Sequence, residues 1–138
     1  MGCSEFNNTY LKALHLRRLL RHQLSSLFRI PNPLTTTKTS KPTNSSSGVP
    51  QDGVDVLLHP TAIHTAPPLD EAKEEGKSEY LQDLLTVPAS LAGLPAMSVP
   101  AGRGTDGWPV GVSLVGQWGM EEMVFWAGKG IESWDGNR

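Results

Sequence analysis

Cysteine and long apolar runs are both scarce in this sequence of 138 residues. Cys3 is the single cysteine, so no disulfide can form within the chain, which is typical of a reducing compartment. No apolar run approaches the roughly 20 residues that a membrane-crossing helix needs. Lys12 and the nearby arginines also interrupt the apolar core that a secretory signal requires. The sequence therefore predicts a chain of ordinary domain size that makes no contact with a membrane.

Charge is distributed unevenly, although the formal net charge is only −2. Residues 1–30 carry five Lys or Arg and one acid, whereas the rest of the chain carries seven basic and thirteen acidic side chains. A basic segment can contact nucleic acid or a membrane, but the whole chain is no polycation. The stretch from Leu11 to Ile30 also resembles a mitochondrial transit peptide, which is basic and poor in acids. We favour the interpretation that it is a surface helix with a solvated basic face.

The first thirty residues are predicted to form one basic amphipathic helix, which is followed by a flexible insertion over residues 31–50. Asn8 or Thr9 can cap the start of the helix, and Pro31 disfavours the α conformation in the residue before it. One helix face repeats apolar residues at spacings of three and four, namely Ala13, Leu16, Leu20, Leu24 and Leu27. In the insertion, thirteen positions hold Pro, Ser or Thr. Such a segment buries too little apolar surface to offset its ordering entropy, which predicts a loop or linker.

Residues 51–138 show short strands and helices in an α/β pattern. The pattern predicts strands over 54–58, 97–101 and 110–115, and helical segments over 80–85, 90–94 and 120–131. A Gly-rich loop joins the last two strands, while Gly128 and Gly130 weaken the last helix. Two or three strands rarely make a self-sufficient sheet that is covered on both faces. The sequence therefore predicts an incomplete piece of a larger α/β fold.

Several short motifs lack the context that would make them functional. The glycines at 102, 104 and 107 match G-x-G-x-x-G, but the residues after them favour a strand rather than the helix that would hold a pyrophosphate. The sequence around Ser113 lacks one of the two glycines of the nucleophile-elbow motif G-x-S-x-G. Ser98 has no histidine or lysine nearby in the sequence that could activate it. His59 and His64 lack the third ligand that zinc requires. No catalytic residue and no metal site is therefore predicted.

Asp83 stands in the otherwise apolar run from Tyr80 to Gly102. A carboxylate is costly to bury in apolar surroundings without a partner. A cationic ligand would stabilise the carboxylate through a charge-assisted hydrogen bond. The alternative is a structural role, in which Asp83 caps a turn or pairs with an arginine. Asp83 is therefore the first candidate for a functional residue.

The same region carries a family resemblance. Residues 80–100, YLQDLLTVPASLAGLPAMSVP, closely resemble the C-terminal part of the amidase-signature family. The stretch GWPVGVSLVG at 107–116 is similar to the family's next segment, with Ser113 in place of the usual glutamine. Upstream, DVLLHPTA at 55–62 resembles D-V-L-L-x-P-T-A, and the stretch 10–28 resembles the preceding basic helix. The family fold is a mixed central sheet covered by helices. The resemblance implies that residues 51–138 form its C-terminal portion and that the first helix belongs to the same fold. Such a fragment is incomplete on its own.

The resemblance also implies a chemistry. Members of the family hydrolyse amides with a Ser–cis-Ser–Lys triad, whose signature is absent from this sequence, so the chain is expected to be inactive alone. The pattern is most similar to the amidotransferase branch, whose members release ammonia from glutamine for a partner subunit that uses ATP to amidate a charged tRNA. In that branch a carboxylate matching Asp83 holds the α-ammonium of glutamine.

This branch implies other subunits as partners, tRNA only through the complex, and no cofactor bound by the segment itself. It implies a mitochondrial location, with the cytoplasm as the alternative. Two other functions stay open. The chain could belong to another amidase of the family that acts on small or fatty amides, or it could be a non-catalytic remnant or binding module.

Overall fold

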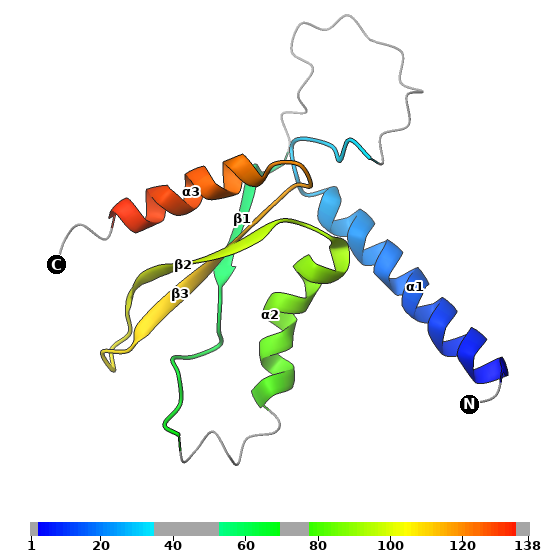
Figure 1. Cartoon of the computed structure of the whole chain (residues 1–138), viewed down its shortest axis with the longest axis horizontal. Coiled ribbons are helices and arrows are strands. Elements are labelled where there is room, and N and C mark those ends of the chain that lie inside the picture. The colour runs from blue at the N-terminus through cyan, green and yellow to red at the C-terminus, as the bar shows by residue number, and fades with distance from the viewer. Residues whose placement is uncertain (1–2, 35–52, 70–77, 135–138) are drawn as a thin grey trace, which may run out of the picture.

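The computed structural model describes residues 3–34, 53–69 and 78–134, which form three helices and three strands (Figure 1). The helices are α1 (Cys3–Ser25), α2 (Ser78–Ala92) and α3 (Glu121–Trp134), and the strands are β1 (Val56–Pro60), β2 (Ala96–Arg103) and β3 (Pro109–Gly116). The α/β class is therefore confirmed. Most of the predicted insertion, from residue 35 onward, lies outside the described residues.

The strands form one sheet in the order β1-β3-β2, and both strand pairs are antiparallel. The hairpin of β2 and β3 is confirmed, and its loop contains Gly107 with a φ of 80°, a backbone conformation that favours glycine. In the register of the sheet, Ser113 of β3 lies between His59 of β1 and Ser98 of β2. Because residues directly opposite each other on neighbouring antiparallel strands point to the same face, these three residues stand on one face of the sheet.

Helix α3 packs against one face of the sheet. Its buried cluster consists of Val99, Leu114 and Val124, and Met97 packs against this cluster. Gly128 permits the close approach of the helix, because a Cβ at this position would lie 2.6 Å from Cε of Met97. The predicted helix over 120–131 is thus confirmed. The glycine that weakens it in isolation is the residue that lets it approach the sheet closely.

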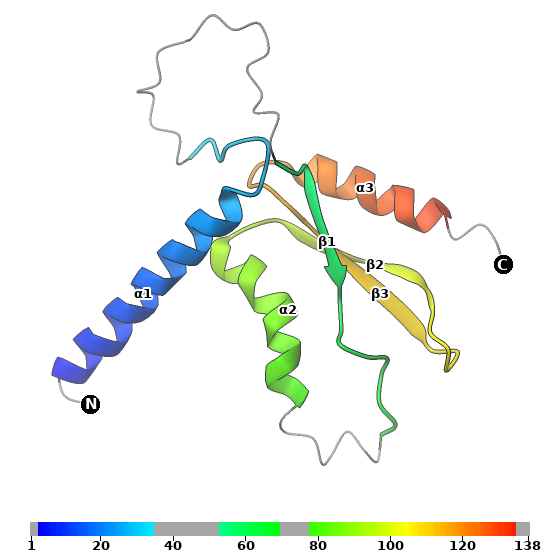
Figure 2. The ribbon, with the colours of Figure 1, turned by 180° about the vertical axis from the view of Figure 1, so that it is seen from behind.

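Helix α2 and the segment after α1 pack against the opposite face. The buried cluster on this side consists of Phe28, Ala89, Ala92, Leu94 and Val115. Most of α1 extends away from the sheet, as the two opposite views show (Figures 1 and 2). Nε of Arg17 donates a hydrogen bond of 2.8 Å to the carbonyl of Leu91, which ties α1 to the end of α2.

The predicted end of the first helix at residue 30 is wrong, and the cap candidates Asn8 and Thr9 lie inside the helix. Helix α1 begins at Cys3, several residues before the predicted cap, and it ends at Ser25, well short of Pro31. The chain leaves the helix because Phe28 is buried, with an exposed fraction of 5%, and forms an isolated parallel bridge with Val54. Packing of this one aromatic side chain therefore outweighs the local helical pattern.

Helix α2 is one continuous element, whereas the sequence predicts two separate helical segments, over 80–85 and 90–94. Pro88 lies inside the helix, although a proline removes one helical hydrogen bond and crowds the preceding turn. Ala89 and Ala92, which follow it, are buried in the cluster against the sheet. This packing favours the helical conformation on both sides of the proline.

Candidate functional site

A groove of about 520 Å³ opens between α2 and the chain that follows β1. Residues 60 and 62–67 form one wall, the first three residues of β3 form the other, and Gln82 of α2 closes one side. The groove therefore joins three segments that are far apart in the sequence. It combines apolar walls with a few polar groups, which is the usual composition of a small-molecule site.

Asp83 follows Gln82 in α2, and its side chain is exposed. The expectation that apolar neighbours bury this carboxylate is therefore wrong for the described residues. The cause is helical geometry: Asp83 precedes the buried Ala92 by about two and a half turns, which places the two residues on opposite sides of the helix. Within the part of the chain that the structure describes, the one salt bridge joins Arg29 to Asp55 at 3.1 Å. No described arginine therefore pairs with Asp83.

Three hydroxyl groups meet beside the groove. Oγ1 of Thr61 lies 2.9 Å from Oγ of Ser113 and 3.3 Å from Oγ of Ser98, and the two serine oxygens are 3.0 Å apart. Ser113 is buried, with 6% of its surface exposed, whereas Ser98 is exposed. Sequence reasoning considered both serines as nucleophiles and did not find this cluster. The register of β2 with β3 and the position of Thr61 directly after β1 create it, and neither is visible in the sequence.

The G-x-G-x-x-G segment is a hairpin loop that fixes one wall of the groove. It leads into strand β3 and not into a helix, so the interpretation as a turn is confirmed. The carboxylate of Asp106 accepts hydrogen bonds from Oγ1 of Thr65 and, at 3.1 Å, from the backbone N–H of Trp108. Both hydrogen bonds stabilise the charged carboxylate, and the bond from Thr65 has the larger effect. They hold the pKa of Asp106 below its ordinary value of 3.8. Asp106 thereby ties the groove wall to the hairpin.

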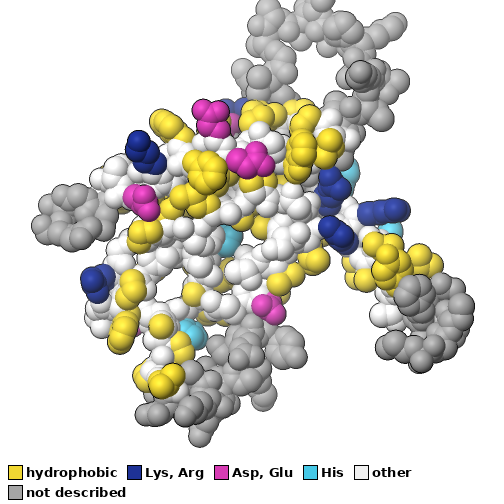
Figure 3. Space-filling model, viewed as in Figure 1, with side chains coloured by type: hydrophobic (Ala, Val, Ile, Leu, Met, Phe, Trp, Pro, Cys, Tyr) yellow, Lys and Arg dark blue, Asp and Glu magenta, His cyan; other side chains and the backbone are white. Residues whose placement is uncertain are grey.

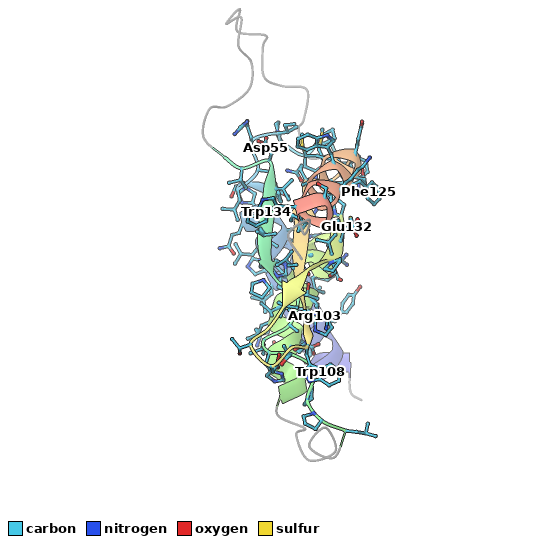
Figure 4. All side chains as sticks on the ribbon, turned by 90° about the vertical axis from the view of Figure 1, so that its left-hand side faces the viewer. Asp55, Arg103, Trp108, Phe125, Glu132 and Trp134 are labelled. Atoms are coloured by element: carbon cyan, nitrogen blue, oxygen red, sulfur yellow. The ribbon has the colours of Figure 1, made fainter. Side chains whose placement is uncertain are left out.

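The hairpin end of the sheet lies apart from the exposed side chains of α3. Arg103 and Trp108 belong to the hairpin, whereas Phe125 and Trp134 belong to α3, and Figure 4 shows the two groups separated along the molecule. Nη1 of Arg103 donates a hydrogen bond of 2.8 Å to the carbonyl of Gly107. This arginine therefore stabilises the loop, and it does not line the groove.

Gln117 is a second residue that sequence reasoning missed. Its side chain is almost completely buried, with 1% exposed. Nε2 donates to the carbonyls of Ser25 and Ile30 at 3.3 and 3.0 Å, and Oε1 accepts from the N–H of Trp118 at 3.0 Å. A single amide thus joins the end of β3 to the chain that leaves α1. Its role is structural, because all its bonds go to backbone groups.

The two histidines near the groove bond to neighbouring backbone. Nδ1 of His59 lies 2.8 Å from the carbonyl of Pro60, and Nδ1 of His64 lies 2.8 Å from that of Thr65. Across residues 3–34, 53–69 and 78–134, no three His, Cys, Asp or Glu side chains are grouped as metal ligands would be.

Apolar surface is also exposed on α1 and on α3. A hollow of about 570 Å³ lies beside α1 and is lined mainly by leucines of that helix together with Leu91. On α3, Phe125 and Trp126 expose 62% and 77% of their surfaces, and Figure 3 shows hydrophobic and acidic side chains together over this helix. None of the helices in the described ranges has the length and apolar character to cross a membrane.

Comparison with known proteins connects the chain to amide-hydrolysing proteins. A sequence model of the family described as Amidase matches residues 2–125. The mitochondrial glutamyl-tRNA(Gln) amidotransferase A subunit of Mycosarcoma maydis is 47% identical over 132 residues, which cover 93% of this chain and 23% of that protein. The protein of the same name from Tuber melanosporum is 38% identical, over 96% of this chain and 26% of that protein. The chain thus spans about a quarter of the length of these curated relatives.

A solved structure shares the fold. The structure of 6-aminohexanoate cyclic dimer hydrolase is 33% identical and matches with a TM-score of 0.50. The match covers 59% of this chain and 19% of that chain. The fold of 59% of this chain therefore resembles part of that hydrolase.

Proposed function

The chain belongs to the amidase family, and on this premise we propose that its groove forms part of the glutamine site of a glutamyl-tRNA(Gln) amidotransferase. In this function glutamine is hydrolysed, and the ammonia released is used to form Gln-tRNA(Gln). The observation that carries the proposal is the identity of 47% with the A subunit of such an enzyme over nearly the whole chain. The groove supports it, because an amide substrate needs a partly apolar recess with a few polar groups.

Asp83 is the proposed contact for the α-ammonium of glutamine. Its carboxylate is exposed and has no described arginine as a partner, so it is available to a cationic ligand. Its neighbour Gln82 lines the groove, and Asp83 follows it in α2, about 100° further around the helix. A charge-assisted hydrogen bond between carboxylate and ammonium is about twice as strong as a bond between neutral groups.

The catalytic step is proposed to need residues that this sequence does not contain. The sequence has no Gly/Ser-rich stretch of the family type that would supply the nucleophilic serine with its lysine. We therefore propose that the chain contributes to substrate binding and does not hydrolyse amides by itself. The same proposal includes the other amidotransferase subunits as partners, with tRNA bound through them and ATP used elsewhere in the complex. It also includes a mitochondrial location. The names of the relatives support the location.

A segment exchange tests this function. This chain replaces the matched stretch of the Mycosarcoma maydis relative, and the exchanged protein is assembled with its partner subunits. We expect glutamine-dependent release of ammonia from the assembled protein and none from the chain alone. Release of ammonia from fatty amides or hydrolysis of the 6-aminohexanoate cyclic dimer, without any glutamine hydrolysis, would instead assign the chain to another amidase.

The role of Asp83 is tested in the same exchanged protein. Asp83→Asn keeps the shape of the side chain and removes its charge, so the KM for glutamine should rise about 10- to 100-fold with little change in kcat. Glu132→Gln is the matched control, because Glu132 is an exposed acid on α3, away from the groove. An unchanged KM in Asp83→Asn would show that this carboxylate does not bind the substrate.

A further inference from the structure

The hydroxyls of Thr61, Ser98 and Ser113 all lie within hydrogen-bonding distance of one another in a ring, so three contacts share three hydrogens. The hydroxyl of Thr61 donates to Ser98 at 3.3 Å, which uses its only hydrogen. Thr61 can then only accept in its 2.9 Å contact with Ser113, so Ser113 is the donor there. The hydrogen of Ser113 is thereby used as well, and Ser98 must donate across the 3.0 Å contact with Ser113. The ring is closed, with each hydroxyl donating once and accepting once.

The closed ring has acceptor capacity and no donor capacity left. Each hydroxyl oxygen has two lone pairs and one hydrogen. The ring uses the hydrogen and one lone pair of each oxygen, so one lone pair of each remains. A ligand that donates hydrogen bonds leaves the ring intact, whereas an anion or a carbonyl oxygen would have to break one bond of the ring to obtain a hydrogen.

The ring lies beside the groove and on the face of the sheet that carries His59. Gly111, which lines the groove, approaches Thr61 so closely that a Cβ there would lie 3.2 Å from Oγ1. His59 pairs with Ser113 across the sheet, and its Nδ1 must donate to the carbonyl of Pro60, because a carbonyl only accepts. In the neutral form of His59, Nε2 is then a further acceptor. The groove lining and the ring contain no lysine or arginine among the described residues.

We propose that the ring of Thr61, Ser98 and Ser113 is a subsite for a nitrogen that carries several hydrogens, namely an ammonium group or a primary carboxamide. An ammonium group has enough hydrogens to donate to all three remaining lone pairs, and a carboxamide nitrogen has enough for two of them. The subsite rests on the proposed function, in which it receives the side-chain amide of glutamine or the ammonium formed from it, while Asp83 receives the α-ammonium. Ser98 is exposed, so the ring is open to a ligand from solvent.

A nuclear magnetic resonance titration of the 138-residue chain tests the subsite. The backbone amide signals are followed while ammonium chloride, glutamine or glutamate is added at constant ionic strength, with sodium chloride as the reference. Ammonium and glutamine should shift the signals of Thr61, Ser98 and Ser113 in a saturable manner. Glutamate has the same α-ammonium as glutamine but no carboxamide, so it should shift mainly the signals around Asp83.

Two variants separate a bound ligand from a general effect. Ser98→Ala removes one acceptor of the ring at an exposed position, where the substitution should not disturb folding, and it should weaken the ammonium and glutamine responses about tenfold. Ser133→Ala on α3 is the control, because its hydroxyl donates to the carbonyl of Gly130 at 2.9 Å, within its own helix. Equal responses of the two variants would overturn the subsite.

The remaining outcomes are also decisive. Shifts around Asp83 with glutamine, without shifts at the ring, would overturn the subsite and leave the proposed glutamine site intact. Ring shifts that sodium chloride reproduces would show an effect of salt and would also overturn it. If no signal responds to any ligand, the subsite is wrong in this chain, and the segment exchange then judges the proposed function independently.

Discussion

Substitution of Gly116 by alanine should destabilise the fold through a single contact. Gly116 ends β3, and a Cβ at this position would lie 2.5 Å from Cγ2 of Val124 in α3. Carbon atoms that are not bonded pack best at about 3.5 to 4.0 Å, so the helix and the strand would have to separate by about 1 Å. The other atoms near this Cβ, at 3.6 and 3.8 Å, lie at ordinary contact distances. The conflict is therefore confined to Val124.

The expected loss of stability can be judged from the effect of overpacking substitutions in other protein cores. A methyl group inserted into a packed interior costs typically about 1–3 kcal/mol, which is a large part of the roughly 5–15 kcal/mol that holds an ordinary domain together. Val124 is 2% exposed and β-branched, so its χ1 angle cannot easily turn away. Gly116→Ala should therefore lower the free energy of unfolding by about 1–3 kcal/mol.

A double-mutant cycle checks this reasoning. Val124→Ala alone should cost roughly 1–3 kcal/mol, because it removes two buried methyl groups. In the double variant the methyl group introduced at position 116 occupies part of the space that Val124 leaves, so the combined loss should be smaller than the sum by about 1 kcal/mol or more. Urea unfolding, followed by tryptophan fluorescence and circular dichroism, measures all four proteins. Additive losses, or a Gly116→Ala variant as stable as the parent, would refute the reasoning.

Two further perturbations test the contacts that shape the groove. Asp106 accepts bonds from Thr65 and Trp108 that lower its pKa below 3.8, so its contribution to stability should be present above that pH and disappear as the pH falls through the folded-state value. Asp106→Ala should therefore be less stable than the parent at about pH 6, and the difference should shrink as the pH falls through the folded-state pKa of Asp106; a difference in urea unfolding that does not change with pH would contradict this. Gln117→Ala leaves two carbonyls without their donor and should cost about 1–3 kcal/mol in the same assay, whereas the exposed control Gln23→Ala should change stability by less than about 0.5 kcal/mol. Similar losses in both glutamine variants would show that the buried amide has no special role.

Local sequence patterns were sufficient to predict those elements whose tertiary contacts favour the same conformation as the pattern. The hairpin of β2 and β3 and the helix α3 follow from alternating or helical spacing and from a Gly-rich loop, and each is close to its predicted position. The end of α1 and the continuity of α2 could not be predicted in this way. Burial of Phe28 ends the first helix early, and burial of Ala89 and Ala92 carries the second helix through Pro88. In both cases contacts with residues far away in the sequence outweigh local preference.

The residues of the candidate site also differ in whether the sequence alone could identify them. Asp83 was selected from the sequence, but the supposed reason, burial among apolar residues, is wrong, because the residue stands on the exposed side of α2. The hydroxyl ring was not foreseen at all. Its three members are separated by up to 52 positions in the sequence, and only the pairing of the strands brings their oxygens together.

The sequence by itself determined the α/β class, the hairpin and the membership of the amidase family. These depend on residue types at fixed spacings along one strand, helix or motif, and such spacings can be read directly from the sequence. The tertiary structure alone decided where the helices end, which residues line the groove, and that three hydroxyls form a closed ring of acceptors. These features depend on the register between strands and on burial, and both are set by the free energy of the whole packed arrangement.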